Sequence, residues 1–438
     1  MIDRGIPERQ GEAAIGPVPG MPLPGDEVPA CRLSRAGMSA RNAPRLRARP
    51  TTPLPLGAPF RSFWMGGYDD SQTQLSAAAR PDALVGDGYS RLLEFGIRSV
   101  RENADWALVD RAGVHDLGPL EQRARMAKDL GVQVAWTLLT HRWPEEIDLL
   151  SAAFVERFAR FARTVAGRVA EFDPGQVPVF TPINELSFLA WSVLSSGRVR
   201  RSDGSLASLK EIKRQLARAA IAACDAILEK VPHARLLHTD PLEHVVAPPG
   251  QPALATAAER RVEQQFEAWD LISGRAVNEL GGSVRYLDLV GVNYYAENQW
   301  ELGSNKRLGW QIDDPRRRPL SAMLKAVHLR YQRPVVIAET SHSGVRRGAW
   351  IREIAAEVRA ARRLGVRIDG VCLHPMIDQL DGANPGKWLL RGLWEVRNDR
   401  GTKNIELTAP YAAALRAAQK VVGALAEDSL PQHAPVHV

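Results

Sequence analysis

Cysteine is scarce in this sequence: its 438 residues include only Cys31, Cys224 and Cys372. Three widely spaced thiols exclude a disulfide framework and a cysteine-rich zinc site, and they are typical of a reducing compartment. The sequence also lacks any run of eighteen apolar residues, so we expect no membrane span. Its first twenty residues lack the apolar core of a secretory signal. We therefore expect a cytoplasmic protein.

The net charge of +7 is unevenly distributed. Residues 29–50 contain six arginines and no acidic residue, so the rest of the chain carries a net charge of only +1. Such a segment is either a basic arm for nucleic acid or membranes, or a disordered terminus, and its Pro- and Gly-rich setting favours disorder. We expect a disordered segment over 1–55, one folded domain over 56–427 and a flexible tail over 428–438. We expect no nucleic-acid or membrane partner.

From residue 60 onward, short runs rich in Val, Ile and Leu alternate with longer segments of helical period. The runs are 62–68, 97–102, 132–138, 177–183, 234–239, 287–293, 334–338 and 368–373, and the helical segments are 81–95, 119–130, 151–170, 207–230, 257–272, 319–331, 350–364 and 409–425. Eight such pairs predict a (β/α)8 TIM barrel of the α/β class. A doubly wound sheet is the alternative, but the glycine-rich phosphate loop that usually follows its first strand is missing. Two long segments, 240–258 and 296–318, are expected to be loops on the active face.

Two glutamates each end an apolar run. Glu185 follows the fourth predicted strand in "VFTPINELSF", and Glu339 follows the seventh in "PVVIAETSHSG". A single glutamate after a strand is ordinarily a neighbour of a helix cap or a surface residue. Two of them at the carboxyl ends of barrel strands indicate a pair of carboxylates at the barrel mouth, which is the equipment for glycoside hydrolysis. Asn184, beside the first glutamate, has an amide that can bind a sugar 2-hydroxyl.

These motifs resemble those of the retaining β-glycosidases with a (β/α)8 barrel, a clan that includes the family 1 β-glucosidases. The resemblance covers residues 60–425 and rests on "FTPINE", "PVVIAETSHSG", "LDLVGVNYY" and "GIRSVRENADW", in that family's strand positions. It implies that Glu185 is the acid/base, that Glu339 is the nucleophile and that Asn184 binds the 2-hydroxyl. It also implies that Tyr295 contacts the nucleophile and that Arg101 keeps it ionised.

Other sugar-binding positions differ from that family. In the third strand the histidine is displaced by one residue, onto His141, and the eighth strand has His374-Pro375 where the family has Trp-Ser. His374 either contacts a sugar or is an ordinary histidine of the barrel rim. Asp381 lies where an acidic sugar ligand is expected, and no residue matches the first-strand glutamine cleanly, with Asp69, Asp70 and Gln72 all open. Four tryptophans in the expected active-face loops either stack on sugar rings or pack the loops: Trp143, Trp300, Trp310 and Trp388.

We therefore expect a retaining glycoside hydrolase that acts on a carbohydrate or glycoside and uses neither a metal nor an organic cofactor. The alternative is a catalytically weak carbohydrate-binding or transglycosylating protein on the same barrel. The changes in the first, third and eighth strands favour this alternative, whereas the presence of both glutamates argues against it.

Overall fold

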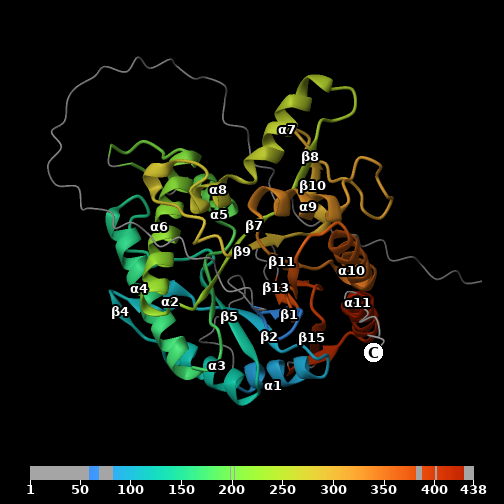
Figure 1. Cartoon of the computed structure of the whole chain (residues 1–438), viewed down its shortest axis with the longest axis horizontal. Helices are drawn as coiled ribbons and strands as arrows, with labels where there is room; N and C mark the ends of the chain where they lie inside the picture. The colour runs from blue at the N-terminus through green and yellow to red at the C-terminus, as the bar shows by residue number, and fades with distance from the viewer. Residues whose placement is uncertain are drawn as a thin grey trace, which may run out of the picture.

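The structure is a computed structural model that describes residues 59–68, 82–197, 199–201, 203–380, 387–399 and 402–428. The predicted N-terminal segment 1–55 and the tail beyond residue 428 lie outside the described residues. Figure 1 shows strands in the middle of the molecule with helices arranged around them.

Eight parallel strands form a closed barrel, in the order β1-β12-β11-β9-β7-β6-β5-β2. This confirms the predicted fold class and all eight predicted strands. The strands are β1 (Trp64–Gly67), β2 (Ser99–Asn103), β5 (Gln133–Leu139), β6 (Val179–Ile183), β7 (Arg235–Pro241), β9 (Leu289–Asn293), β11 (Val335–Thr340) and β12 (Ile368–Leu373). Because a barrel strand is covered on both faces, it has few polar residues except near its ends.

The outer layer consists of α1 (Asp82–Leu93), α3 (Gly118–Asp129), α4 (Ala152–Phe172), α6 (Leu209–Lys230), α8 (Glu267–Ser273), α9 (Leu320–Tyr331), α10 (Arg347–Arg363) and α11 (Ala409–Asp428). Serine begins two of the longest helices: the side chain of Ser151 accepts a hydrogen bond from the Phe154 amide, and Ser208 forms a capping box with Glu211. The single helix predicted over 257–272 is wrong. The segment forms α7 (Ala255–Gln264) and α8, with a short break between them.

Side chains alternate between two cores. One core fills the barrel interior and contains residues from seven strands together with Phe60: Met65, Ala135, Val179, Leu237, Leu289, Val336, Ala338 and Cys372. The other lies between the barrel and its helices and takes the intervening positions, such as Val335 and Ile337. This period of two decides which residue at each strand end faces the barrel mouth.

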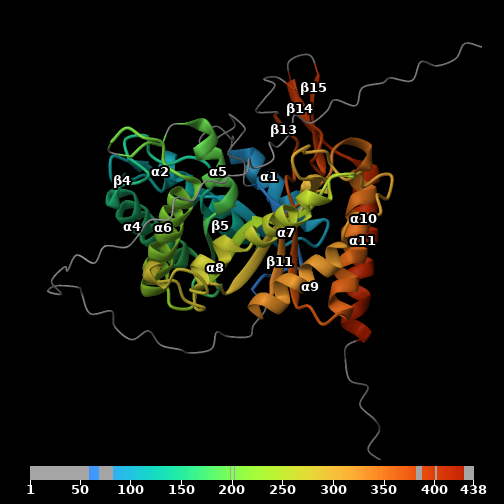
Figure 2. The ribbon, with the colours of Figure 1, turned by 90° about the horizontal axis from the view of Figure 1, so that it is seen from above.

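The sequence patterns did not predict several of the observed elements. The expected loops 240–258 and 296–318 contain β8 (His244–Val246) and β10 (Gln299–Glu301), which pair with each other, and α7 packs against them. Figure 1 shows α7 extending away from the barrel. After β12 come β13 (Gln379–Leu380), β14 (Trp388–Leu389) and the hairpin of β15 (Trp394–Asp399) and β16 (Thr402–Leu407), and Figure 2 shows β13, β14 and β15 projecting beyond the barrel. The remaining short elements are α2 (Trp106–Val109), β3 (Asp110–Arg111), β4 (Val114–His115), α5 (Leu186–Ser196), and the 3-10 turns Pro252–Leu254, Asn278–Leu280, Ala296–Asn298 and Gly344–Arg346.

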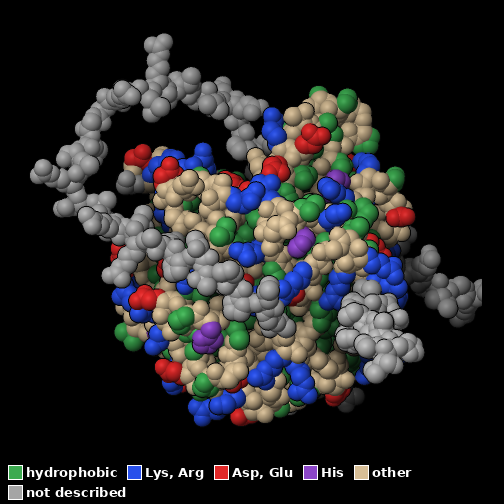
Figure 3. Space-filling view, in the orientation of Figure 1, with side chains coloured by type: hydrophobic (Ala, Val, Ile, Leu, Met, Phe, Trp, Pro, Cys, Tyr) green, Lys and Arg blue, Asp and Glu red, His purple; other side chains and the backbone are tan. Residues whose placement is uncertain are grey.

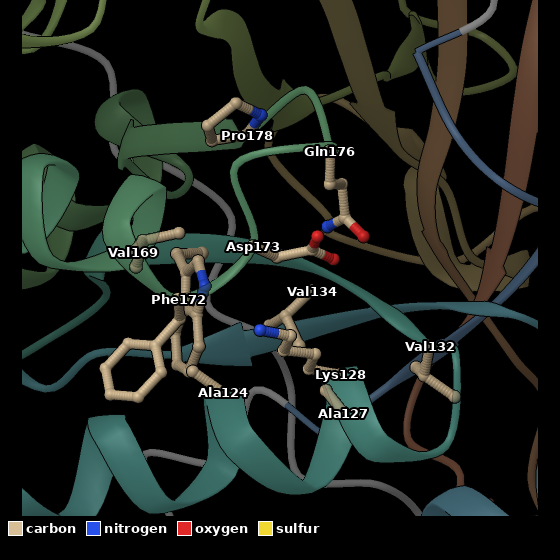
Figure 4. A pocket seen from close by; sticks show the side chains of 11 residues that line it. Ala124, Ala127, Lys128, Val132, Val134, Val169, Phe172, Asp173, Gln176 and Pro178 are labelled. Atoms are coloured by element: carbon tan, nitrogen blue, oxygen red, sulfur yellow. The ribbon is translucent and has the colours of Figure 1, made fainter.

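A hollow of about 30 Å³ lies between the C-terminal ends of α3 and α4 and the start of β5, with Phe172, Val134 and Lys128 in its wall. Figure 4 shows these side chains converging from the two helices and the strand.

In the part of the chain that the structure describes, none of the helices combines the length and the apolar composition that a membrane span needs. On the face in Figure 3, basic and acidic side chains are interspersed.

Candidate active site

Glu185 lies between the end of β6 and the first turn of α5. Its backbone adopts a left-handed conformation, with φ 49° and ψ 54°, which is uncommon for a residue other than glycine and clusters at functional sites. Two backbone bonds hold this turn, because the Glu185 amide donates to the Thr239 carbonyl and the Leu189 amide donates to the Glu185 carbonyl. The Glu185 side chain makes no cap hydrogen bond to α5. Its carboxyl group is therefore not used as an ordinary helix cap.

Glu339 reaches the mouth because β11 is irregular. Val336 and Ala338 point into the barrel, so a regular strand would turn residue 339 outward, towards the helices. The pairing of β11 with β9 shifts register between Ile337 and Glu339. A register shift of this kind re-aims a side chain, and it brings the Glu339 carboxylate into the barrel mouth, where the residue is only 6% exposed.

Arg101, on β2, is fully buried beside Glu339. Its Nη1 donates to the Glu339 carboxylate at 3.2 Å and to the Ala338 carbonyl at 2.7 Å. Its Nη2 donates to Thr137 Oγ1 at 3.3 Å and to Asn184 Oδ1 at 3.0 Å. A planar guanidinium bound on both arms cannot turn away, so it holds a fixed positive charge against Glu339.

Asn184, which precedes Glu185 in the chain, is bonded to Glu339. Its Oδ1 accepts hydrogen bonds from Arg101 and from Thr239 Oγ1, the latter at 2.7 Å, and these bonds fix the orientation of the amide. Its Nδ2 then faces Glu339 and donates to the carboxylate at 3.2 Å. Thr239 can lie this close because Gly291 is its neighbour: a Cβ on that glycine would come 2.5 Å from Thr239 Cγ2.

The end of β9 and the residues that follow it contribute one hydrogen-bond donor to each glutamate. Asn293 Nδ2 donates to Glu185 Oε1 at 2.9 Å, and the Tyr295 hydroxyl donates to Glu339 Oε2 at 2.9 Å. Asn293 and Tyr295 are two positions apart, so they share the inward face, whereas Tyr294 between them stacks on Trp350 in the outer layer. Burial, reinforced by the two carboxylates, raises the pKa of Tyr295 well above its usual range, so the phenol keeps its proton.

The two glutamates are held in opposite protonation states. Burial raises the pKa of Glu185 to about 8, with a further contribution from the negative charge of Glu339. Burial acts on Glu339 in the same direction, but the charges of His374 and Arg101 and the bond from Tyr295 outweigh it and hold the pKa of Glu339 below its usual value. At neutral pH the pair is thus one neutral acid and one carboxylate.

His374, at the end of β12, lies beside the same carboxylate. Its Nδ1 is 3.7 Å from Glu339 Oε2 and 3.5 Å from the Tyr295 hydroxyl. The ring lies against β1 at Gly67, where a Cβ would come 2.4 Å from His374 Cδ2. A side chain at position 67 would therefore displace the histidine. The structure places His374 at the carboxylate pair, as an electrostatic neighbour of Glu339.

The other predicted sugar-binding residues lie around this centre or beyond it. His141 follows β5, and its ring packs edge-on against Phe188 of α5, with centroids 6.3 Å apart. Trp388 is half-buried in β14, close in sequence to Arg391, whose guanidinium lies 5.9 Å from the Tyr295 ring centroid. Asp381 lies outside the described residues, as do Asp69, Asp70 and Gln72. Trp300 takes the second of the two alternatives given for the tryptophans: it packs under α7 between Arg261 and Arg307, and its burial excludes stacking on a sugar.

Sequence reasoning missed Asn293, Thr239 and Asp240. Asn293 had a usable signal, because the period of two from Tyr295 places it on the same face. Thr239 and Asp240 end the fifth barrel strand without a recognisable motif, and only the closed barrel brings them against residues 184–187. In the described part of the chain, no three His, Cys, Asp or Glu residues form a group that fits a metal ion, and the buried Cys224 and Cys372 form no disulfide there.

Comparison with known proteins places the chain on a known fold. No protein-family model and no curated protein matches the chain. Among solved structures, it is similar to β-glycosidase BGL167, at 18% identity over 82% of this chain and 88% of that one, with a TM-score of 0.61. It is also similar to the β-glycosidase from the hyperthermophile Thermosphaera aggregans (16% identity, 80% and 88% covered, TM-score 0.62) and to the Thermotoga maritima β-glucosidase in complex with castanospermine (14%, 82% and 97%, TM-score 0.61). At these identities the likeness is one of fold: the chain has the barrel that these β-glycosidases share.

Proposed function

We propose that this protein is a glycoside hydrolase that cleaves β-linked glycosides and retains the configuration at the anomeric carbon. The observation that carries the proposal is the contrast between Glu185, held protonated, and Glu339, held ionised, at one barrel mouth. Two carboxyl groups whose surroundings separate their pKa values are the acid and the nucleophile that this reaction needs.

The proposed reaction has two steps. Glu339 attacks the anomeric carbon while Glu185 gives its proton to the departing glycosidic oxygen, and a covalent glycosyl ester forms. Glu185, now ionised, takes a proton from water, and that water attacks the anomeric carbon, whose bond to the Glu339 carboxylate oxygen breaks and releases Glu339. Glu185 is partly exposed, as a group must be to exchange protons with an aglycone and with water.

The remaining residues are proposed to support these two. Arg101 and Tyr295 keep Glu339 ionised and fix its orientation. Asn184 Nδ2 lies beside Glu339, where it can also bind the 2-hydroxyl of a sugar. His141, His374, Asp381 and Trp388 are proposed sugar contacts. The reaction as written needs no cofactor, since the two carboxyl groups perform every proton transfer and the displacement.

The first test is covalent labelling. A 2-deoxy-2-fluoroglycoside with an activated leaving group should label Glu339 one-to-one, and peptide mass spectrometry should locate the label. Turnover of 4-nitrophenyl β-glycosides should be abolished in Glu339→Gln and retained in Glu353→Gln, a control on α10 whose side chain is exposed outside the barrel. NMR should show the β-anomer as the first product. A first product with the α-configuration, or full activity in Glu339→Gln, would overturn the proposal.

The same experiments separate the alternative functions. Glucoimidazole, which occupies the Thermotoga maritima neighbour, is a direct probe of binding. Binding of glucoimidazole without turnover or labelling indicates a carbohydrate-binding protein, whereas a second glycoside among the products indicates transglycosylation.

A further inference from the structure

Asp240 is a buried carboxyl group directly behind the candidate acid, and the proposed reaction assigns it no task. It is the penultimate residue of β7 and is 1% exposed. Alternation along β7 turns Thr239 into the barrel, against Asn184, and turns Asp240 outward, under the first turn of α5. The two side chains thus hold the segment 184–187 from opposite sides.

One oxygen of Asp240 caps the helix that Glu185 begins. The Ser187 amide, in the first turn of α5, donates to Asp240 Oδ1 at 3.0 Å. A helix ordinarily receives this bond from its own N-cap side chain, and here that residue is Glu185, whose side chain makes no such bond. A neighbouring strand therefore supplies the cap, and the Glu185 carboxyl is left available for a substrate.

The second oxygen has no such task. Asp240 Oδ2 is buried and makes no hydrogen bond within the described residues. A buried carboxylate oxygen without a partner is costly, and such groups are retained mainly where their charge or their bonds serve a function. Its field acts on the candidate acid, since the negative charge of Asp240 raises the pKa of Glu185 beyond the effects of burial and Glu339.

The charged groups around Asp240 leave its negative charge largely uncompensated. Lys213 of α6 faces it, but the ammonium group donates to Glu267 of α8 at 2.7 Å. Glu243, from the segment after β7, adds a like charge. Burial, assisted by Glu243 and opposed by Ser187 and Lys213, raises the pKa of Asp240 to about 7.

We propose that Asp240 is a positioning residue for Glu185, which fixes the first turn of α5 through Ser187 and places a buried negative charge behind the acid/base carboxyl. The charge disfavours a second negative charge at Glu185, so the proton stays on Glu185 until the aglycone oxygen accepts it. This role rests on the proposed hydrolase function, but its electrostatic part is a property of the free protein.

The test distinguishes the effect of the negative charge of Asp240 from the effect of its hydrogen bond to the Ser187 amide. Asp240→Asn keeps an oxygen for the Ser187 amide and removes the charge, so the basic limb of the pH profile of kcat/KM should move down by roughly 0.5–1 pH unit, with a near-normal Tm. Asp240→Ala also removes the cap, so it should show the same shift together with a lower kcat and a lower Tm. Asp288→Asn is the control: this carboxyl is equally buried and pairs with Arg235 at the far end of the barrel, so the variant should lower the Tm and leave the basic limb in place.

A titration that needs no substrate keeps the two proposals distinguishable. In protein labelled with ¹³C at the glutamate carboxyls, the Glu185 signal is assigned by its loss in Glu185→Gln, and its midpoint should fall in Asp240→Asn. An unchanged midpoint in a folded Asp240→Asn variant overturns the inference even if the enzyme cleaves glycosides. A lowered midpoint in a protein that cleaves no glycoside supports the electrostatic coupling and counts against the hydrolase proposal.

Discussion

Replacement of Arg101 by methionine tests what keeps Glu339 ionised. Arg101 is completely buried. Its guanidinium donates one hydrogen bond to each of four groups: Glu339, the Ala338 carbonyl, Thr137 and Asn184. Methionine fills similar space along the stem and supplies neither the charge nor the donors. The Glu339 carboxylate would then lie in a buried site with His374 and Tyr295 as its main support.

The expected magnitude follows from the geometry. A guanidinium at hydrogen-bond distance lowers a carboxyl pKa by roughly 1–3 units, which corresponds to about 1.4–4 kcal/mol of preference for the ionised form. Loss of Arg101 should therefore raise the pKa of Glu339 and move the acidic limb of kcat/KM to higher pH by about the same 1–3 units. Below this limb Glu339 carries a proton and cannot attack, so each pH unit by which the limb moves should lower the activity on the acidic side by up to about tenfold.

The assay is kcat/KM for a 4-nitrophenyl β-glycoside between pH 4 and pH 9, with thermal unfolding measured in parallel. Arg123→Met is the matched control. Arg123 is also buried and pairs with Glu102, the residue next to Arg101, but on the outer side of β2. Both variants should unfold at lower temperature, and only Arg101→Met should move the acidic limb. An acidic limb that stays in place in Arg101→Met would show that His374 and Tyr295 suffice and that the reasoning is wrong.

Four further predictions follow from other side-chain contacts. Because burial and Glu339 raise the pKa of Glu185 to about 8, kcat/KM should fall above that pH for aryl glycosides with poor leaving groups, and Glu185→Ala should lose far more rate on these than on dinitrophenyl glycosides. Asn293→Ala removes a bond that favours the ionised form of Glu185, so the basic limb should move to higher pH, which the same pH profile measures. Tyr295→Phe removes one bond to Glu339 and should lower kcat/KM by roughly tenfold, with no fall if that bond is absent in solution. Phe158→Ala opens a cavity among the aromatic rings of α4 and should reduce the free energy of unfolding by about 3–5 kcal/mol in urea titrations.

The elements of the barrel could be read from local patterns. Val- and Ile-rich runs such as Val335–Thr340 are long enough for a buried strand and too short for a helix, and the Ala- and Arg-rich segments between them have a helical period. The helix α5 could not be read in this way, because it is apolar on nearly every side and lacks that period. The sequence patterns also did not predict β8, β10 and the hairpin after β14. A short strand within a long loop has little local signal, because it forms only when it pairs with a neighbouring strand.

The sequence by itself determined that Glu185 and Glu339 end strands on one face of a parallel barrel, because parallel strands share the direction of their carboxyl ends. Only the tertiary structure decided what surrounds them. The register shift that turns Glu339 inward depends on the neighbouring strand β9, the four bonds of Arg101 join segments as far as 238 positions apart, and the cap from Asp240 crosses 53 positions to α5. The physical reason is that a period of two or 3.6 residues is a local property of the chain, whereas the charges and hydrogen bonds that set a pKa come from whichever side chains the closed barrel brings together.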